Sequence, residues 1–188
     1  TAVLEQYGVI NRIDISDGGS TYTGTPTITI EEPNQVTFDT FSDISGTTFT
    51  LPNNPFTNNL RIVYDNNSGS ESIGLSSGTI YYVVNKSGDN FGLASSQGGS
   101  AISLSPSADS SSAESHSLKG VNAEATLTAS AGVITGITIT EQGTLYDGNS
   151  LPSITFSEDV GANAASLQVY CGRSVSYTHL RAHETMAH

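Results

Sequence analysis

The chain repeats itself, and this repeat limits the possible fold more than any other feature of the sequence. When the chain is shifted against itself by 124 positions, eight of the seventeen residues in 8–24 are identical. Unrelated sequences of ordinary composition would share about one. The eight residues Gly8, Val9, Ile10, Ile13, Ile15, Gly19, Tyr22 and Gly24 fall on Gly132, Val133, Ile134, Ile137, Ile139, Gly143, Tyr146 and Gly148. Such a unit is too small to bury its apolar face alone, so we expect the copies to pack together.

The match extends beyond this stretch in both directions. After two extra residues, Pro26, Ile28 and Ile30 fall on Pro152, Ile154 and Phe156, and upstream Val3 falls on Leu127. A third copy begins at Gly161, where the register slips by one residue, because Leu167 does not align with Leu127. The sequence therefore divides into a first repeat (1–33), an inserted module (34–118), a second repeat (119–160) and the truncated start of a third repeat (161–173).

Each copy alternates polar and apolar residues with a period of two, which is typical of β-strands. Val133, Thr135, Ile137 and Ile139 are expected on one face of a strand that points to the core. Gly19 and Gly143 stand at the strand exits, where a chain reversal favours positive φ. The tyrosines that follow, Tyr22 and Tyr146, are expected to cover the small core with their rings, with direct ligand stacking as the alternative.

The inserted module is also rich in β-strand signals. Clusters of Asn, Asp, Gly and Pro separate its apolar runs, and no stretch combines helix caps with a period of 3.6. We predict an all-β fold of short antiparallel repeat units, with an inserted small β-barrel or sandwich-like module. The strands expected in the insert are 36–38, 47–51, 60–64, 79–84, 91–94 and 101–104, followed by a flexible connection over 105–117 with a short strand at His116.

Charge and composition exclude several classes of protein. The chain has 6 Lys plus Arg against 18 Asp plus Glu, a formal net charge of -12, so no basic stripe is available for nucleic acid. The sequence contains no run of about 20 apolar residues, so it predicts no membrane-spanning helix. The single cysteine, Cys171, allows neither a disulfide framework nor a cysteine-based zinc site within the chain.

A search for catalytic residues finds no converging set. His116 is the only histidine before residue 174, so a Ser-His-Asp arrangement would depend on one residue of a serine-rich segment. The acidic pairs Glu31-Glu32 and Glu158-Asp159 follow strands at equivalent ends of the repeats, which favours solvated strand ends over a glycosidase pair. We predict no enzyme activity, no catalytic residue and no cofactor.

One segment resembles part of a calcium loop. Asp65, Asn67, Gly69 and Glu71 alternate along the chain as calcium ligands do, but the spacing to a bidentate glutamate is missing. A turn is the favoured interpretation, and a weak calcium site is the alternative. We therefore predict no metal ligands.

The C-terminal segment 174–188 differs in character from the rest. Residues 175–185 read Val-Ser-Tyr-Thr-His-Leu-Arg-Ala-His-Glu-Thr, which is similar to the in-frame translation of a transposon-type sequencing adapter. We expect this segment to be adapter read-through that makes few contacts, and we expect both ends of the chain to be truncated. His179 and His183, spaced as metal ligands can be, are set aside on this ground.

The two kinds of module resemble a known group of proteins. The motif Gly-Val-Ile-x-x-Ile-x-Ile-x-x-x-Gly-x-x-Tyr, followed by Pro-x-Ile-x-Ile/Phe, resembles the glycine and tyrosine β repeats of virion structural and tail-fibre-like proteins of bacteriophages, especially marine T4-like phages. The insert resembles a second module of the same proteins, through Ile-Gly-Leu-Ser-Ser-Gly-Thr-Ile-Tyr-Tyr-Val-Val at 73–84 and Phe-Gly-Leu-Ala-Ser-Ser at 91–96. The loop around Asp17-Gly18-Gly19 departs from the usual pattern, which has a third glycine.

This resemblance implies a structural role in a phage virion, as a tail fibre or baseplate-associated spacer that also touches the host surface. The implied partners are further copies of the chain, other virion proteins and a host surface glycan. The alternative is a bacterial cell-surface or secreted repeat adhesin. We expect the insert to protrude, its ends near 33–34 and 119–120 to lie close together, and any host contact to involve loops 52–58, 65–72 or 86–90.

Overall fold

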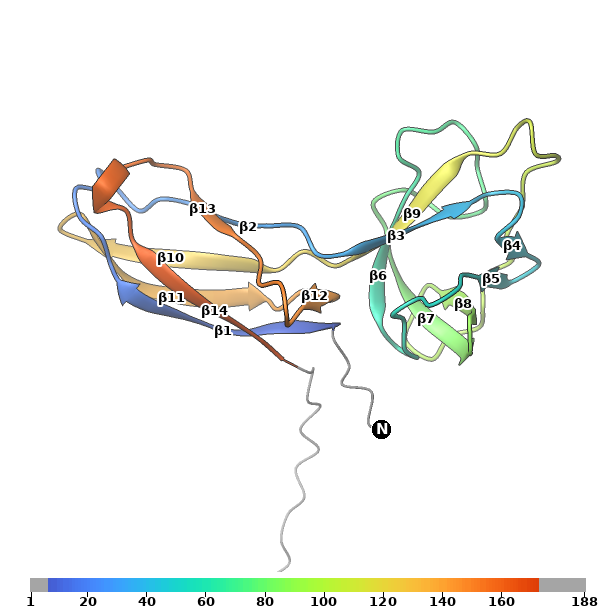
Figure 1. Ribbon diagram of the computed structural model, residues 1–188, viewed down its shortest axis with the longest axis horizontal. Helices are drawn as coiled ribbons and strands as arrows, with labels where there is room; N and C mark the ends of the chain where they lie inside the picture. Colours follow the sequence, from blue (N-terminus) through green and yellow to red (C-terminus); the bar gives the residue numbers. More distant parts are fainter. Residues whose placement is uncertain (1–6, 173–188) are drawn as a thin grey trace, which may run out of the picture.

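The computed structural model describes residues 7–172, and these residues form β-strands and a single short 3-10 turn. The predicted all-β class is confirmed. The strands gather into two lobes, which Figure 1 shows at the two ends of the long axis. We call residues 34–120 the insert, and the lobe formed by the segments before and after it the repeat module. Within residues 7–172 no helix is long and apolar enough to cross a membrane.

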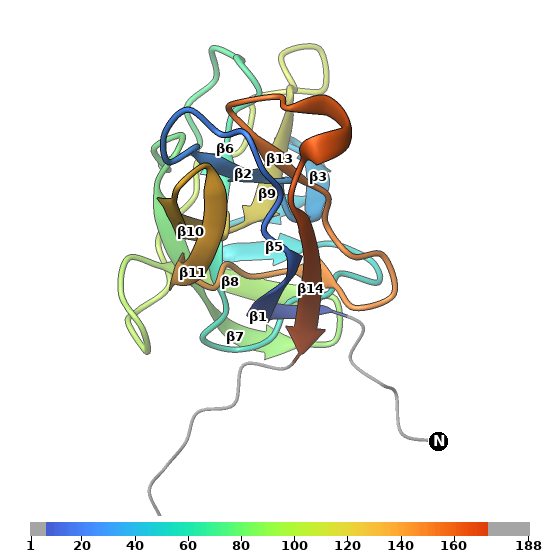
Figure 2. The same cartoon turned by 90° about the vertical axis from the view of Figure 1, so that its left-hand side faces the viewer.

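The repeat module consists of two paired ladders joined by a short central pair. Strand β1 pairs with β14 and β12, β10 pairs with β11, and β13 pairs with β2, all antiparallel. Figure 2, viewed from the end of this lobe, shows β10 and β11 on one side and β1 and β14 on the other. The bounds are β1 Tyr7–Asp17, β2 Ile28–Ile30, β10 Glu124–Ser130, β11 Val133–Glu141, β12 Tyr146–Asp147, β13 Ile154–Phe156, η1 Gly161–Asn163 and β14 Ser166–Gly172.

The insert is one seven-stranded antiparallel sheet in the order β3-β9-β6-β7-β8-β5-β4. Phe38 of β3 packs against Phe49 of β5 with ring centroids 5.1 Å apart, although four strands lie between them in the ladder, so the sheet curls over its own core. The ladder does not close, since β3 and β4 remain its two edges, and the barrel alternative is wrong. The bounds are β3 Gln35–Asp39, β4 Ile44–Ser45, β5 Thr48–Thr50, β6 Arg61–Asp65, β7 Ile80–Ser87, β8 Asn90–Ala94 and β9 Ser115–Gly120.

Two expectations about strands in the insert need correction. Segment 101–104 is not a strand, because Ile102 N–H bonds to Leu93 O (2.8 Å) while Leu104 N–H bonds to Gly46 O (2.7 Å), and single bonds to separate partners make no ladder. The strand expected at His116 is the six-residue β9, which pairs with both β3 and β6 inside the sheet. The serine-rich stretch therefore ends in a strand of the sheet interior.

The two ladders of the repeat module have the same register. Ile13 pairs with Val169 as Ile137 pairs with Leu127, and each ladder contains two irregularities at equivalent places. The extra residues are Asn11 and Ser16 in β1 and Thr135 and Thr140 in β11. Strand β14 thus stands beside β1 as β10 stands beside β11.

These bulges explain why one predicted face of β11 is wrong. An extra residue at Thr135 reverses the alternation, because a bulge places two residues opposite one. Ile134 and Ile137, an odd number of positions apart, therefore both face the core, while Val133 is 37% exposed. Ile10 and Ile13 do the same in β1, so the expectation that Ile13 and Ile137 share an apolar interior is confirmed.

A glycine and a tyrosine build the corner after each of these strands. Gly19 and Gly143 have φ of 67° and 68°, as predicted, and a β-carbon on either would meet the backbone of the neighbouring connection, at Asn163 O (2.5 Å) or Val121 O (2.7 Å). The Tyr22 hydroxyl accepts the Ala165 N–H (2.9 Å), and the Tyr146 hydroxyl accepts the Ala123 N–H (2.9 Å). Both rings are buried, so stacking on a ligand is wrong and packing over the core is confirmed.

The pair β2–β13 relates the two units by an approximate two-fold axis. Thr29 lies opposite Thr155, with Ile30 opposite Ile154 and Ile28 opposite Phe156. Because the repeat aligns Ile28 with Ile154 and Ile30 with Phe156, exchanging the two units leaves this register unchanged. The two repeats are therefore halves of one interlocked body.

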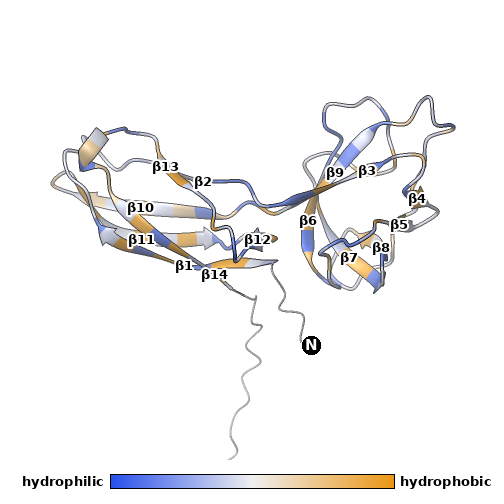
Figure 3. Ribbon diagram, viewed as in Figure 1, coloured by the Kyte–Doolittle hydropathy of each residue, from blue (hydrophilic) through white to orange (hydrophobic). Residues whose placement is uncertain are grey.

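The insert occupies one of two equivalent connections in this body. Strand β13 reaches β14 through the short segment that contains η1, whereas β2 reaches β10 through the whole insert. The ends of the insert meet: Gly120 N–H donates to Asn34 O (3.0 Å), and Gln35 lies opposite Lys119. The prediction that the two junctions lie close together is confirmed. The stretch that leads from β2 into β3 is hydrophilic, as Figure 3 shows.

Candidate functional site

A cluster of buried and partly buried polar side chains in the insert, which we call the polar network, is the first candidate site. It begins at His116, the second residue of β9, which is fully buried. The His116 Nδ1 lies 2.8 Å from the Tyr64 hydroxyl, and Nε2 lies 3.1 Å from Glu114 Oε2. The pKa of Tyr64 is raised to about 12, chiefly because the hydroxyl is buried and to a lesser extent because carboxylates lie nearby. The network comprises Thr40, Tyr64, Glu71, Ser107, Glu114 and His116.

Glu114 holds the loop between β6 and β7 in place. Its carboxylate accepts the N–H groups of Ser70 (3.0 Å) and Glu71 (2.9 Å) and the Ser70 hydroxyl (3.0 Å). These backbone donors lower the pKa of Glu114 from its ordinary value of 4.5 to about 2, with a further contribution from His116. The carboxylate therefore remains charged far into the acid range.

Glu71 completes the network from the other side. Its carboxylate accepts the hydroxyl of Thr40 (2.5 Å) and that of Ser107, and Thr40 in turn accepts the Glu114 N–H (2.8 Å). Thr40 and Ser107 are both buried. Within residues 7–172 every buried side-chain nitrogen and oxygen has a hydrogen-bond partner. The network therefore fastens three loops to the sheet, as a fully satisfied buried network does.

The geometry around His116 is not that of a nucleophilic triad. Both ring nitrogens contact groups other than a serine hydroxyl, namely Tyr64 and Glu114. Ser107, the buried serine of the network, donates to Glu71 instead. A histidine can activate a serine only within hydrogen-bond reach of it, so His116 and Ser107 do not form a nucleophile and base pair.

The residues that resemble a calcium loop do not converge. Asp65 accepts the Asn67 N–H (2.9 Å) and pairs with Lys119 (3.4 Å), whereas Glu71 points into the polar network. No group of three His, Cys, Asp or Glu side chains in the described part of the chain could hold a metal ion. The alternating pattern coincides with a turn at Asn67 and Ser68, and the side chains of Asp65 and Glu71 bind different partners.

One glutamate of each acidic pair, Glu31 or Glu158, binds backbone across the approximate two-fold axis. Glu31 accepts the N–H of Ser153 (2.8 Å), a bond that lowers its pKa, and Glu158 accepts the N–H of Thr23 (3.0 Å). Asp159 accepts the Gly161 N–H (2.8 Å). Glu31 and Glu158 therefore each fix a loop of the other repeat.

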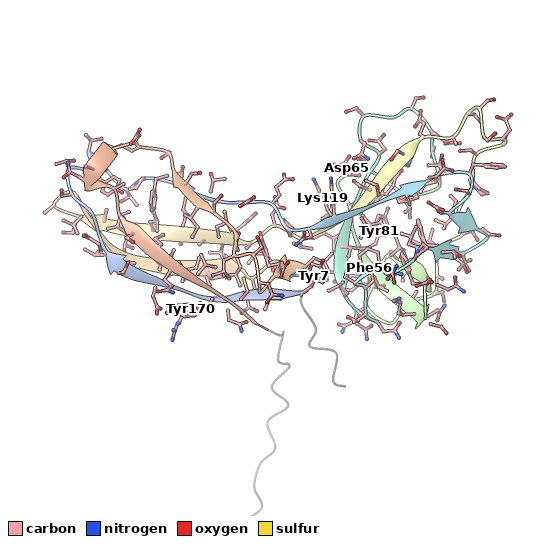
Figure 4. All side chains as sticks on the ribbon, in the orientation of Figure 1. Tyr7, Phe56, Asp65, Tyr81, Lys119 and Tyr170 are labelled. Carbon is pink, nitrogen blue, oxygen red and sulfur yellow. The ribbon has the colours of Figure 1, made fainter. Side chains whose placement is uncertain are left out.

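A groove at the junction of the two lobes is the second candidate. It has a volume of about 350 Å³ and lies where β6, β7 and β9 of the insert approach β10 and β11. Two of its charged side chains are paired, Lys119 with Asp65 and Glu141 with Arg61. Figure 4 shows Lys119 and Asp65 beside each other at this end of the insert. The lining residues are Val63, Gly78, Ile80, Lys119, Val121, Asn122, Glu124 and Glu141.

The loops expected to contact a host fall into two places. Loops 52–58 and 86–90 lie together, because Asn54 Nδ2 donates to Asp89 O (3.1 Å) and Asp89 accepts the Asn53 N–H (3.1 Å). Lys86 N–H donates to Asn58 Oδ1 (3.0 Å) and extends this contact. Loop 65–72 instead packs against Glu114. The first two loops therefore form one exposed surface rich in amide side chains, which we call the amide surface.

Sequence reasoning missed the polar network and the pairing across the junction. Arg61 and Glu141 stand 80 positions apart, and Tyr64 and His116 stand 52 apart, so no local motif joins them. The alternation Glu114-x-His116-x-Leu118 indicates a strand, but nothing in it identifies the partners. The segment 174–188 and its histidines lie outside the described residues.

Comparison with known proteins adds no relative. No family model, no curated protein and no solved structure matches the chain. The function must therefore be inferred from the geometry of the molecule.

Proposed function

We propose that the chain is a structural component of a phage virion, part of a tail fibre or a baseplate-associated spacer, whose insert is presented for contact with the host surface. One observation carries this proposal: the insert replaces a short connection of the repeat module and is fixed to that module by several independent contacts. Its mechanism is geometric, since a lobe held rigidly on a stiff body keeps a fixed orientation.

Two of the contacts at the junction come from Thr144 and Leu145, in the corner that precedes Tyr146. Thr144 accepts the Val121 N–H (2.8 Å) and donates to Arg61 O (2.8 Å), so one hydroxyl links both lobes. Leu145 is 2% exposed and belongs to the core of the insert. Its equivalent in the first repeat, Thr21, is exposed, although both residues have positive φ. The second repeat thus differs from the first where it meets the insert.

The amide surface is the contact region we favour. Asn53, Asn58 and Asp89 are exposed there and lie on loops whose backbone is fixed by hydrogen bonds. Amide and carboxylate groups bind the hydroxyls of sugars, and a fixed loop loses little conformational entropy on binding. A host surface glycan is the proposed ligand class, while further copies of the chain and other virion proteins are the proposed assembly partners.

The test is the location of the protein. In a culture that carries the gene, purified phage particles and the bacterial envelope fraction are digested with trypsin and searched by mass spectrometry for the peptide of residues 62–86. The proposal predicts the peptide in the particles. Its presence in the envelope fraction alone overturns the proposal and supports the alternative, a cell-surface or secreted repeat adhesin.

A further inference from the structure

The position beside β1 is filled by a strand from the other end of the described chain. Strand β14 pairs with β1 over the same register, with the same two bulges, as β10 pairs with β11. The corner contact is the same as well, since Ala165 N–H donates to Tyr22 as Ala123 N–H donates to Tyr146, both at 2.9 Å. The acceptor position is therefore defined by β1 and Tyr22 and does not require that the incoming strand be continuous with β1.

In the second repeat the corresponding strands are joined by a tight turn. Ser130 lies opposite Val133, with only Ala131 and Gly132 between them. In the first repeat Gly172 lies opposite Val9 and takes the place of Ser130. The link between β10 and β11 holds them together at a very high effective concentration, whereas β14 has no such link to β1.

We propose that β14 is a transferable strand, which pairs with β1 of its own chain in an isolated copy and with β1 of a neighbouring copy in an assembly. The partner is a second copy of this chain. The side chains that β14 buries, Leu167, Val169 and Cys171, find the same neighbours in either arrangement, so transfer preserves these core contacts. The segment between β13 and β14, in which residues 161–164 are exposed, serves as the hinge.

This inference deepens the proposed structural role, on which its biological meaning rests, because transfer would join copies directly into a fibre. It does not depend on the host contact or on the virion location. The experiment below detects the strand transfer itself, and the peptide search above tests the location.

The experiment mixes two single-cysteine chains. Both carry Cys171→Ala, which copies Ala129 and removes the only native thiol; one also carries Asp14→Cys and the other Gln168→Cys. Asp14 and Gln168 are opposite each other on β1 and β14. The matched control uses Thr138→Cys and Thr126→Cys, the equivalent opposite pair on β11 and β10. Tags of different size and a short bismaleimide crosslinker identify the mixed dimer on a denaturing gel.

We expect about tenfold more mixed dimer from the β1/β14 chains than from the control chains, because the tight turn keeps β10 on its own β11. A chain with both Asp14→Cys and Gln168→Cys verifies that the pair reacts when adjacent. Equal yields in the two mixtures overturn the transferable strand. If the chains still associate on size-exclusion chromatography, copies join through another surface and the structural role stands. Transfer without any peptide in phage particles leaves this inference standing and overturns the virion location.

Discussion

Arg61 and Glu141 form a two-pronged ion pair across the boundary of the two lobes. The Nη1 atom lies 3.0 Å from Oε2, and the Nη2 atom lies 2.5 Å from Oε1. The pairing lowers the pKa of Glu141 and raises that of Arg61, chiefly through the side-chain hydrogen bonds. A fork-shaped pair fixes direction as well as distance, so it orients the insert on the repeat module.

Removing this charge pair should loosen the junction. We expect Glu141→Gln to lower the free energy of unfolding by about 1 kcal/mol, since the pair is partly exposed to water. Asp14→Asn, which breaks the more exposed Arg12–Asp14 pair, is the control and should change stability little. Urea titrations measure both, and equal effects would show that the junction pair has no special role.

Leu145 should contribute to stability because its side chain enters the core of the insert. We expect Leu145→Thr, which copies Thr21 of the first repeat, to cost about 2–5 kcal/mol, the range for truncating a buried leucine. The reverse change, Thr21→Leu, is made at an exposed position and should stay within about 0.5 kcal/mol. Thermal unfolding of the two variants decides this, and a mild Leu145→Thr would mean that the lobes are docked loosely.

The two corner tyrosines should differ in their contribution. Tyr146 accepts the Ala123 N–H and also donates to Glu31 O (3.1 Å), whereas Tyr22 accepts the Ala165 N–H. Tyr146→Phe leaves a buried donor and an acceptor without their partner, so we expect a loss of about 1–3 kcal/mol and a smaller loss for Tyr22→Phe. Chemical denaturation of both variants is the measurement, and the opposite order would contradict the assignment of these bonds.

The polar network predicts how stability depends on pH. Because folding lowers the pKa of Glu114 from 4.5 to about 2, its contribution is fully present above pH 4.5 and is lost as the pH falls towards 2. We expect Glu114→Gln to be less stable at neutral pH and to lose less stability over this acid window. Glu124→Gln, at an exposed position on β10, is the control and should keep the wild-type slope. An unchanged slope in Glu114→Gln would rule out this carboxylate as the titrating group.

The repeat module should fold without the insert. Residues 32–122 are replaced by a second copy of segment 158–164, which gives both units the same connection, and Leu145→Thr removes the apolar side chain left exposed. We expect a cooperative thermal transition and β-type circular dichroism, together with loss of binding to host cells. An unfolded product, or a folded one that still adheres, would contradict the division into a stiff body and a presented lobe.

The sequence alone predicted what depends on local pattern. The alternation along 8–15 and 132–139 identified strands, because a period of two puts successive side chains on opposite faces. The corners were identified from Gly19 and Gly143 and from the tyrosine that follows each of them. A backbone with positive φ favours glycine, so the residue type itself is visible in the sequence. The close junctions of the insert also followed from the sequence, because a module can replace a connection only when its ends meet.

Only the tertiary structure decided which strands pair and where the registers slip. The side chains do not determine which strand pairs with which, because backbone hydrogen bonding does not depend on them. Strand β14 with Leu167 and Val169 fits beside β1 as well as β10 with Ala125 and Leu127 fits beside β11. No particular residue type marks these bulges in the sequence, so Val133 was assigned to the wrong face of β11. Arg61 meets Glu141, and Tyr64 meets His116, across long stretches of chain. Such contacts exist only once the sheet has curled and the lobes have docked, because folding alone brings distant residues within reach.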